Sequence, residues 1–127
     1  MARLISRLLF LLALLAVGPA QALGEAYEQT VFDGLMARGQ PVLVWIHADW
    51  CATCKAQGKV LPGLLRRPEL ADIRVLKVDF DSRKPLVREF RAFQQSTLIM
   101  FRGGRETGRS IGDTDPDSLR ALLSKAP

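Results

Sequence analysis

The chain has 127 residues, 48% of them hydrophobic, and its 18 basic and 13 acidic residues give a net charge of +5. This length supports one compact core rather than several domains. The positive charge is small and scattered, so we expect no nucleic-acid partner, and two cysteines are too few for a secreted scaffold held together by disulfides.

The N-terminus has the three parts of a secretory signal peptide. Two arginines make it positive, an unbroken apolar run follows over residues 8–17, and the small-residue sequence AQA ends at Ala22. As a helix, the apolar run spans about half of a bilayer, which is too short for a membrane span. We therefore predict a cleaved signal peptide at 1–22, a mature domain at 23–127 and a periplasmic location. An uncleaved N-terminal anchor is the alternative.

Hydrophobic periodicity predicts alternating helices and strands in the first half of the mature chain. An amphipathic helix is expected over 25–38, followed by a strand over 42–47 that is apolar on both faces and therefore buried. A helix over 52–66 comes next. We expect a bend or interruption in this helix at its glycines and proline, Gly58, Pro62 and Gly63.

The second half of the mature chain predicts one more crossover and a final hairpin. The expected elements are a strand over 73–80, a helix over 83–92, a strand over 97–101, a glycine turn at 103–104, a strand over 105–111 and a helix beginning at 115–116. Strands joined by a helical crossover run parallel, whereas hairpin strands run antiparallel. The predicted fold class is therefore α/β, with a mixed four-stranded sheet and helices on both faces.

Cys51 and Cys54 are the only two cysteines, and they lie where the apolar strand gives way to a helix. Thiols three residues apart share one side of a helical turn and can form a disulfide. The ring would be so small that the bond would stabilise the fold little, which favours a bond that opens and closes. An inert disulfide and half of a metal site are the alternatives. Because His47 is the only histidine, we expect neither metal nor cofactor.

The position of the pair predicts different roles for the two thiols. At a helix N-terminus, the dipole and the free N–H groups favour a thiolate, so the pKa of Cys51 should fall below about 8.5. Cys54 lies one turn further along and should be more buried and less acidic. Cys51 is thus the expected nucleophile and Cys54 the resolving thiol of thiol–disulfide exchange.

The segment PVLVWIHADWCATCK at 41–55 resembles the active-site strand and helix of the thioredoxin superfamily, and it is especially similar to the C-terminal domain of the membrane reductase DsbD. KVDFD at 77–81 and TLIMFRGG at 97–104 resemble the family's second strand and final hairpin. The similarity covers about residues 40–123. It implies a thioredoxin fold and agrees with the roles expected for the two thiols.

The resemblance also implies roles for residues around the cysteines. Trp50 would cover one side of the active site and help partners to dock. Gln95 and Ser96 would offer backbone groups to an extended substrate segment. Lys77 matches a family lysine that supports the site by pairing with a buried aspartate.

Two positions depart from the family pattern. The buried aspartate, six residues before the nucleophile, is replaced by Trp45, so we expect slower deprotonation of Cys54 at neutral pH; the alternative is that Trp45 is simply core and Lys77 extends outward. The family's cis-proline is replaced by Ser96. A cis bond before another residue costs about 2.5–4 kcal/mol, so we predict a trans peptide here and a Ser96 hydroxyl that donates to the Cys51 thiolate.

Ala52 and Thr53, between the cysteines, carry no charge that would stabilise the thiolate, which predicts a moderately reducing pair. We expect an exported, monomeric thiol–disulfide oxidoreductase that reduces disulfides in protein substrates. In an oxidising compartment it would need a membrane electron donor of the DsbD kind. A thiol oxidase or isomerase is one alternative, and a weakly redox-active binding module with a thioredoxin fold is another.

Overall fold

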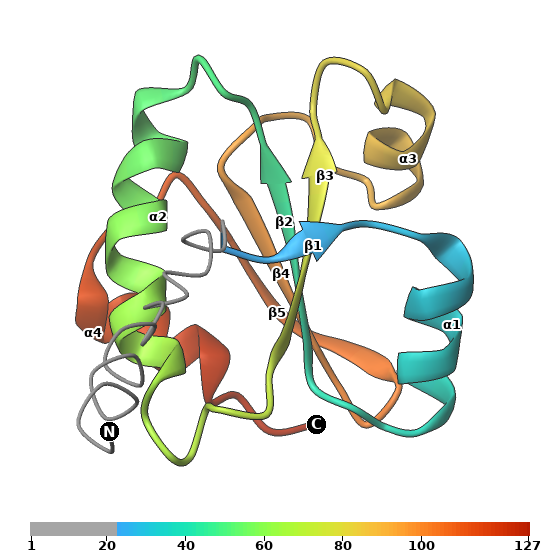
Figure 1. The fold of residues 1–127 in the computed structure, drawn as a ribbon, viewed down its shortest axis with the longest axis vertical. Coiled ribbons are helices and arrows are strands. Elements are labelled where there is room, and N and C mark those ends of the chain that lie inside the picture. Colours follow the sequence, from blue (N-terminus) through green and yellow to red (C-terminus); the bar gives the residue numbers. More distant parts are fainter. Residues whose placement is uncertain (1–22) are drawn as a thin grey trace, which may run out of the picture.

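The computed structural model describes residues 23–127, so the predicted signal peptide lies outside the described residues. Helices and strands alternate as expected through most of this range (Figure 1). The elements are β1 (Glu25–Ala26), α1 (Gln29–Ala37), β2 (Val42–His47), α2 (Ala52–Leu65), β3 (Arg74–Asp79), α3 (Lys84–Glu89), β4 (Thr97–Arg102), β5 (Arg105–Ile111) and α4 (Pro116–Leu123).

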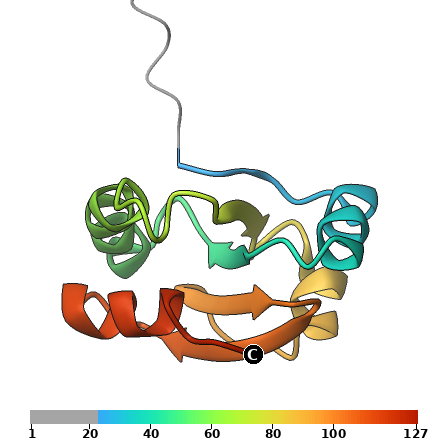
Figure 2. The ribbon, with the colours of Figure 1, turned by 90° about the horizontal axis from the view of Figure 1, so that it is seen from below.

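The strands form one mixed sheet in the order β1-β3-β2-β4-β5. β2 pairs in parallel with β3 and antiparallel with β4, and β4 and β5 form the predicted hairpin. The turn between them uses two glycines with positive φ, Gly103 and Gly104, a backbone conformation that costs glycine little. α2 and α4 cover one face of the sheet, and α1 and α3 cover the other (Figure 2). The predicted α/β class with a mixed sheet is confirmed.

The edge strand β1 is the main difference from the sequence prediction. The predicted helix over 25–38 begins only at Gln29, because Glu25 and Ala26 pair in parallel with Leu76 and Lys77 of β3. The four predicted strands correspond to β2–β5, and β1 adds a short fifth strand. Two residues are too few to show an alternating pattern, so the pairing with β3 decides their conformation.

The helix α2 is continuous from Ala52 to Leu65, so its glycines and proline do not interrupt it. Pro62 lies inside the helix, where it lacks the N–H that would donate to the preceding turn. Gly58 has a packing reason instead. A Cβ at this position would lie 3.4 Å from the ring of Trp45, so the helix backbone packs closely on the indole beneath it.

β2 divides the core into two layers. Leu43 and Trp45 pack with the buried side chains of α2 and α4, together with both cysteines. Val42, Val44 and Ile46, whose side chains point to the other face of the sheet, pack against α1 and α3. Every residue of β2 except His47 is buried, as expected of a central strand covered on both faces. The cysteines therefore follow directly after the most buried strand in the sheet.

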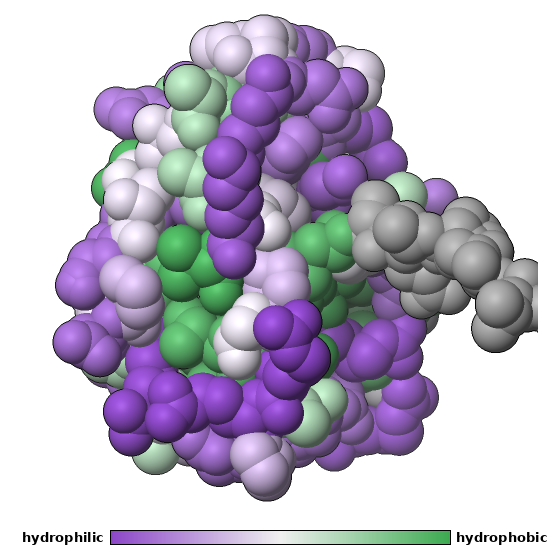
Figure 3. Space-filling model, turned by 60° about the vertical axis from the view of Figure 1, so that its left-hand side comes forward, coloured by the Kyte–Doolittle hydropathy of each residue, from purple (hydrophilic) through white to green (hydrophobic). Residues whose placement is uncertain are grey.

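Apolar residues also gather on the face of the molecule that carries α2, close to the beginning of the described chain (Figure 3). A shallow hollow of about 440 Å³ opens there, and its walls include Leu23, Leu65 and Val75. It lies at the end of α2 opposite to the cysteines. Among residues 23–127, no helix is long and apolar enough to cross a membrane.

Candidate active site

The two cysteines lie at the junction of β2 and α2, and both are free thiols. Cys51 is the N-cap residue of α2, and its Sγ accepts a hydrogen bond from the backbone N–H of Cys54 at 3.0 Å. A sulfur thus occupies the place where a serine or aspartate oxygen usually satisfies a free N–H group of the first turn. Cys51 is 3% exposed and Cys54 is fully buried, so only the first thiol reaches the surface.

Burial and hydrogen bonds shift the pKa values of the two thiols in opposite directions. Burial raises the pKa of Cys51, but donors from Cys54, Ser96 and the backbone N–H of Thr53 outweigh burial, and the pKa falls below that of an ordinary thiol. Burial raises the pKa of Cys54, and its hydrogen bond to Cys51 raises it further. The acidity of each thiol therefore matches its expected role.

Ser96 lies directly against the nucleophile. Its Oγ is 3.4 Å from Cys51 Sγ, and because a thiolate carries no proton, the hydroxyl must donate once Cys51 ionises. The peptide before Ser96 is trans, as predicted. Its backbone has a φ of +58°, in the left-handed region that residues with a Cβ seldom adopt. The position of the family's proline is thus filled by a buried and strained serine.

This strain predicts different stabilities for two variants of Ser96 that both lack the hydroxyl. Alanine keeps the Cβ that disfavours a positive φ, whereas glycine removes it. We expect S96G to be more stable than S96A by about 1 kcal/mol, measured by urea unfolding of the reduced proteins. Equal stabilities would contradict a left-handed backbone at this position.

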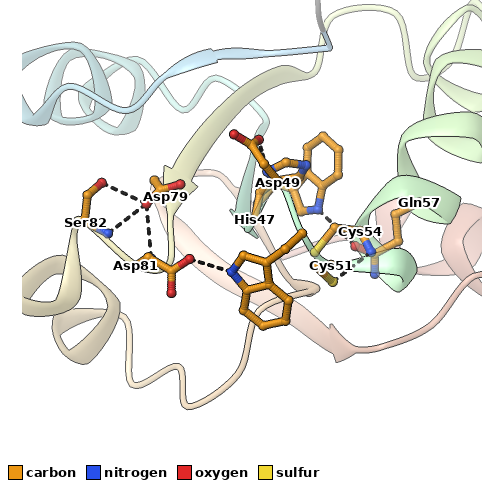
Figure 4. A network of polar contacts seen from close by, with 10 residues as sticks. His47, Asp49, Cys51, Cys54, Gln57, Asp79, Asp81 and Ser82 are labelled. Carbon is orange, nitrogen blue, oxygen red and sulfur yellow. Dashed lines mark hydrogen bonds and ion pairs between the residues drawn. The ribbon is translucent and has the colours of Figure 1, made fainter.

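Trp50 and Gln95 each lie next in the chain to a residue of the site, Trp50 before Cys51 and Gln95 before Ser96. Trp50 is 61% exposed, and its indole N–H donates to Asp81 Oδ2 at 2.6 Å, which fixes the ring beside the nucleophile. Asp81 and its neighbours lie on one side of Cys51 and Gln57 lies on the other (Figure 4). Gln95 is half-buried in the loop before Ser96. Sequence reasoning missed Asp81, because its bond to Trp50 joins segments 31 residues apart.

Lys77 lies on the same face of the sheet as Trp45, its partner in the β2–β3 register. Together with His47, Asp49 and Asp79 it lines a polar hollow of about 290 Å³ that includes neither cysteine in its walls. Burial, followed by the charge of Lys77, lowers the pKa of His47. A neutral imidazole at neutral pH suits a half-buried strand residue. The structure therefore places Lys77 beside His47 and does not bring it to the thiols.

Trp45, at the position of the family's buried aspartate, is hydrogen-bonded to a second residue, Gln57. Its indole N–H donates to Gln57 Oε1 at 2.9 Å, and Gln57 is fully buried. Sequence reasoning missed Gln57, although one signal was present. It is the single polar residue on the buried stripe of α2 that Cys54, Leu61 and Leu64 share.

The arrangement offers a dithiol and neutral hydrogen-bond donors, and no group of three or more metal-ligating side chains occurs within residues 23–127. A dithiol with one acidic and one buried thiol can pass two electrons to a disulfide and become a disulfide itself.

The lowered pKa of Cys51 predicts the pH dependence of its reactivity. Because the thiolate is the reactive form, alkylation of Cys51 by iodoacetamide should reach its half-maximal rate at a lower pH than for an unperturbed thiol. The rate should fall as pH drops through the pKa of Cys51. Mass spectrometry of the modified peptide measures this rate. C54A keeps the nucleophile but removes the side-chain donor of Cys54, so the midpoint of Cys51 should be higher in this variant. A wild-type midpoint at or above that of free cysteine would contradict the prediction.

Comparison with known proteins agrees with this geometry. The thioredoxin family model matches residues 22–125. A thioredoxin from Chlamydia trachomatis is 40% identical over 101 residues, which cover 80% of this chain and 91% of that protein. The crystal structure of Trxlp from Edwardsiella tarda is 45% identical, with a TM-score of 0.75 over 79% of this chain and 97% of that one.

A thioredoxin from Halobacterium salinarum, solved as its N21Q mutant, has the same fold at 27% identity, with a TM-score of 0.68 over 84% of this chain and 93% of that one. The more specific similarity to the C-terminal domain of DsbD stays a prediction. The chain belongs to the thioredoxin family, and its Cys51/Cys54 pair makes it a thiol–disulfide oxidoreductase.

Proposed function

We propose that this protein is an exported reductase of protein disulfides, with Cys51 as nucleophile and Cys54 as resolving thiol. The observation that carries the proposal is the pattern of donors at Cys51 Sγ, which the backbone N–H of Cys54 and the Ser96 hydroxyl both reach. They stabilise the thiolate in a folded protein whose two thiols are both free.

The chemistry balances as a two-electron transfer. The Cys51 thiolate attacks one sulfur of a substrate disulfide, forms a mixed disulfide and expels the other substrate sulfur as a thiolate. Cys54 loses its proton to solvent and attacks Cys51 Sγ, which releases the second substrate thiolate and leaves a Cys51–Cys54 disulfide. Because no carboxylate contacts Cys54 in the described structure, we expect resolution to be slower at neutral pH than attack.

The charge of the donors supports the proposed direction of electron flow. The groups that lower the pKa of Cys51 are all neutral, and the residues between the cysteines are Ala52 and Thr53. A nearby cation would favour the thiolate more strongly, stabilise the reduced form and make the pair a stronger oxidant. We therefore place the reduction potential closer to about −270 mV than to the value near −120 mV that is typical of strong oxidants.

A reductant in an oxidising compartment needs a source of electrons. We propose a membrane-bound dithiol donor of the DsbD kind, which would reduce the Cys51–Cys54 disulfide by the same exchange in reverse. The N-terminal sequence pattern of residues 1–22 supports export to the compartment where such a donor acts.

Trapping with a resolving-thiol variant tests the proposed reaction. C54S, expressed as the full chain, should accumulate disulfide-linked complexes through Cys51, because the mixed disulfide cannot be resolved. These complexes should disappear under dithiothreitol and should be absent in the matched variant C51S. Recovery of non-covalent complexes alone, together with no reduction of insulin disulfides by the wild type, would support the binding module instead.

Equilibration with glutathione buffers measures the direction of transfer. A potential near −120 mV would overturn the proposed reductant role and support the oxidase alternative.

Export has a separate test. The mass of the full chain after expression in a bacterium should show the loss of residues 1–22, and an uncleaved chain in the cytoplasm would contradict export.

A further inference from the structure

The carboxamide of Gln57 connects three segments that lie far apart in the sequence. Its Oε1 accepts from the indole of Trp45 at 2.9 Å, and its Nε2 donates to the carbonyls of Ser96 at 3.1 Å and Asp113 at 3.0 Å. The side chain is fully buried, and both amide hydrogens are used. α2 is thereby joined to β2, to the loop before β4 and to the loop after β5.

The partners allow only one orientation of this amide. The indole of Trp45 can only donate and the two carbonyls can only accept, so Oε1 must face Trp45 and Nε2 must face Ser96 and Asp113. A completely satisfied polar network inside an apolar layer holds its members rigidly, because every rearrangement leaves a buried group without a partner.

The hydrogen bond from Gln57 to Ser96 connects Gln57 indirectly to Cys51, because Ser96 contacts both residues. The carbonyl of Ser96 accepts from Gln57 and from the backbone N–H of Gly112 at 3.0 Å, while its hydroxyl lies 3.4 Å from Cys51 Sγ. Ser96 has the left-handed backbone described above, and such a conformation persists only where its surroundings hold it. The amide of Gln57 is the side chain that holds the carbonyl end of this residue.

We propose that Gln57 is a positioning residue of the redox centre, which holds the Ser96 hydroxyl against Cys51 Sγ through the Ser96 carbonyl and is itself oriented by Trp45. This role presupposes the proposed function of Cys51 as nucleophile. It also gives Trp45 a purpose at the position of the family's acid. The indole sets the direction of a neutral amide, where relatives with an aspartate would hold a charge.

A double-mutant cycle between Gln57 and Ser96 tests the proposal. Q57M keeps the length of the side chain but cannot bond to the Ser96 carbonyl, and S96A removes the hydroxyl. The readout is the pH midpoint of Cys51 in the reduced protein, followed by thiolate absorbance at 240 nm and by the alkylation rate of the Cys51 peptide. Cys54 on α2 is the titratable group in contact with Cys51, and the other donors, Ser96 and the backbone of Thr53, are neutral.

We expect S96A to raise the midpoint by about one pH unit, since a hydrogen bond to a charged group is lost. Q57M should raise it by a similar amount, and the double variant should add little to either change, because both act on the same bond. Additive shifts, or an unchanged midpoint in Q57M, would overturn the proposal.

Two further variants separate positioning from general stability. W45F keeps a ring beneath α2 but lacks the indole N–H, so it should raise the midpoint in the same direction by a smaller amount, and it provides the test if Q57M fails to fold. L61A, one turn after Gln57 on the same helix, removes buried apolar atoms and should lower stability without moving the midpoint. If L61A shifts the Cys51 midpoint as much as Q57M does, the shift results from a general loss of stability and the positioning role is overturned.

The outcome separates this role from the proposed function. If the wild-type protein reduces insulin disulfides and Q57M has the same Cys51 midpoint as the wild type, only the positioning role of Gln57 is wrong. If the wild type neither reduces disulfides nor shows an acidic Cys51, the proposed function fails first.

Discussion

Replacing Cys51 with serine should lower disulfide reduction by about a thousandfold or more. A serine hydroxyl does not ionise near neutral pH, so the nucleophile is lost even though the side chain keeps nearly the same shape. The donors that stabilise the thiolate, Ser96 Oγ and the N–H of Cys54, would remain in place without an anion to stabilise. Reduction of insulin disulfides with dithiothreitol as electron source measures the loss.

C54S is the matched control for this experiment. It retains the attacking thiol and should react once with a substrate disulfide before stopping as a mixed disulfide. The two serine variants should therefore differ in a single-turnover assay, where C54S releases one substrate thiol per protein and C51S releases none. Residual activity of C51S above about one tenth of wild type would contradict Cys51 as the nucleophile.

Truncating Leu61 to alanine should cause a large loss of stability. Leu61 is fully buried in the core layer between α2 and the sheet. A Leu-to-Ala change at such a site costs about 2–5 kcal/mol through lost burial and the remaining cavity. For a domain of this size, we expect the melting temperature to fall by roughly 8 °C or more, measured by circular dichroism.

Lys59 on the same helix provides the control. Its side chain is exposed, so K59A should change the free energy of unfolding by no more than about 0.5 kcal/mol. A loss below about 1 kcal/mol in L61A would be inconsistent with its buried position, because the transfer cost of the removed atoms alone exceeds that value.

Most of the fold follows from local patterns that the sequence shows directly. The apolar run of β2, the glycine pair of the hairpin and the Asp115-Pro116 start of α4 each specify their own element. Asp115 Oδ1 accepts from Asp117 N–H as an N-cap side chain should. The short strand β1, which the sequence prediction missed, and the uninterrupted course of α2 both depend on tertiary context. β1 exists because β3 offers an edge, and α2 continues through Pro62 because its buried stripe packs on the sheet.

The candidate site likewise has one part that local sequence indicates and another that depends on tertiary contacts. The spacing of Cys51 and Cys54 at a strand-to-helix junction indicates a reactive thiol pair without any structure, because helix geometry and the exposed N–H groups of a first turn are local properties. The opposite shifts of the two pKa values agree with these properties. The structure shows their causes, which are burial for Cys54 and hydrogen-bond donors for Cys51.

What surrounds the pair was decided only by tertiary structure. Ser96 lies 45 residues from Cys51 along the chain, and Gln57 reaches across 39 residues to Ser96 and across 56 to Asp113. No local pattern encodes such contacts, because they depend on the order of strands in the sheet and on the layer that α2 covers. The sequence alone therefore determined the thiol chemistry and the fold class. The folded chain decided which neutral groups replace the family's acid and proline, since only packing brings Trp45, Gln57 and Ser96 to the same side of the sheet as the cysteines.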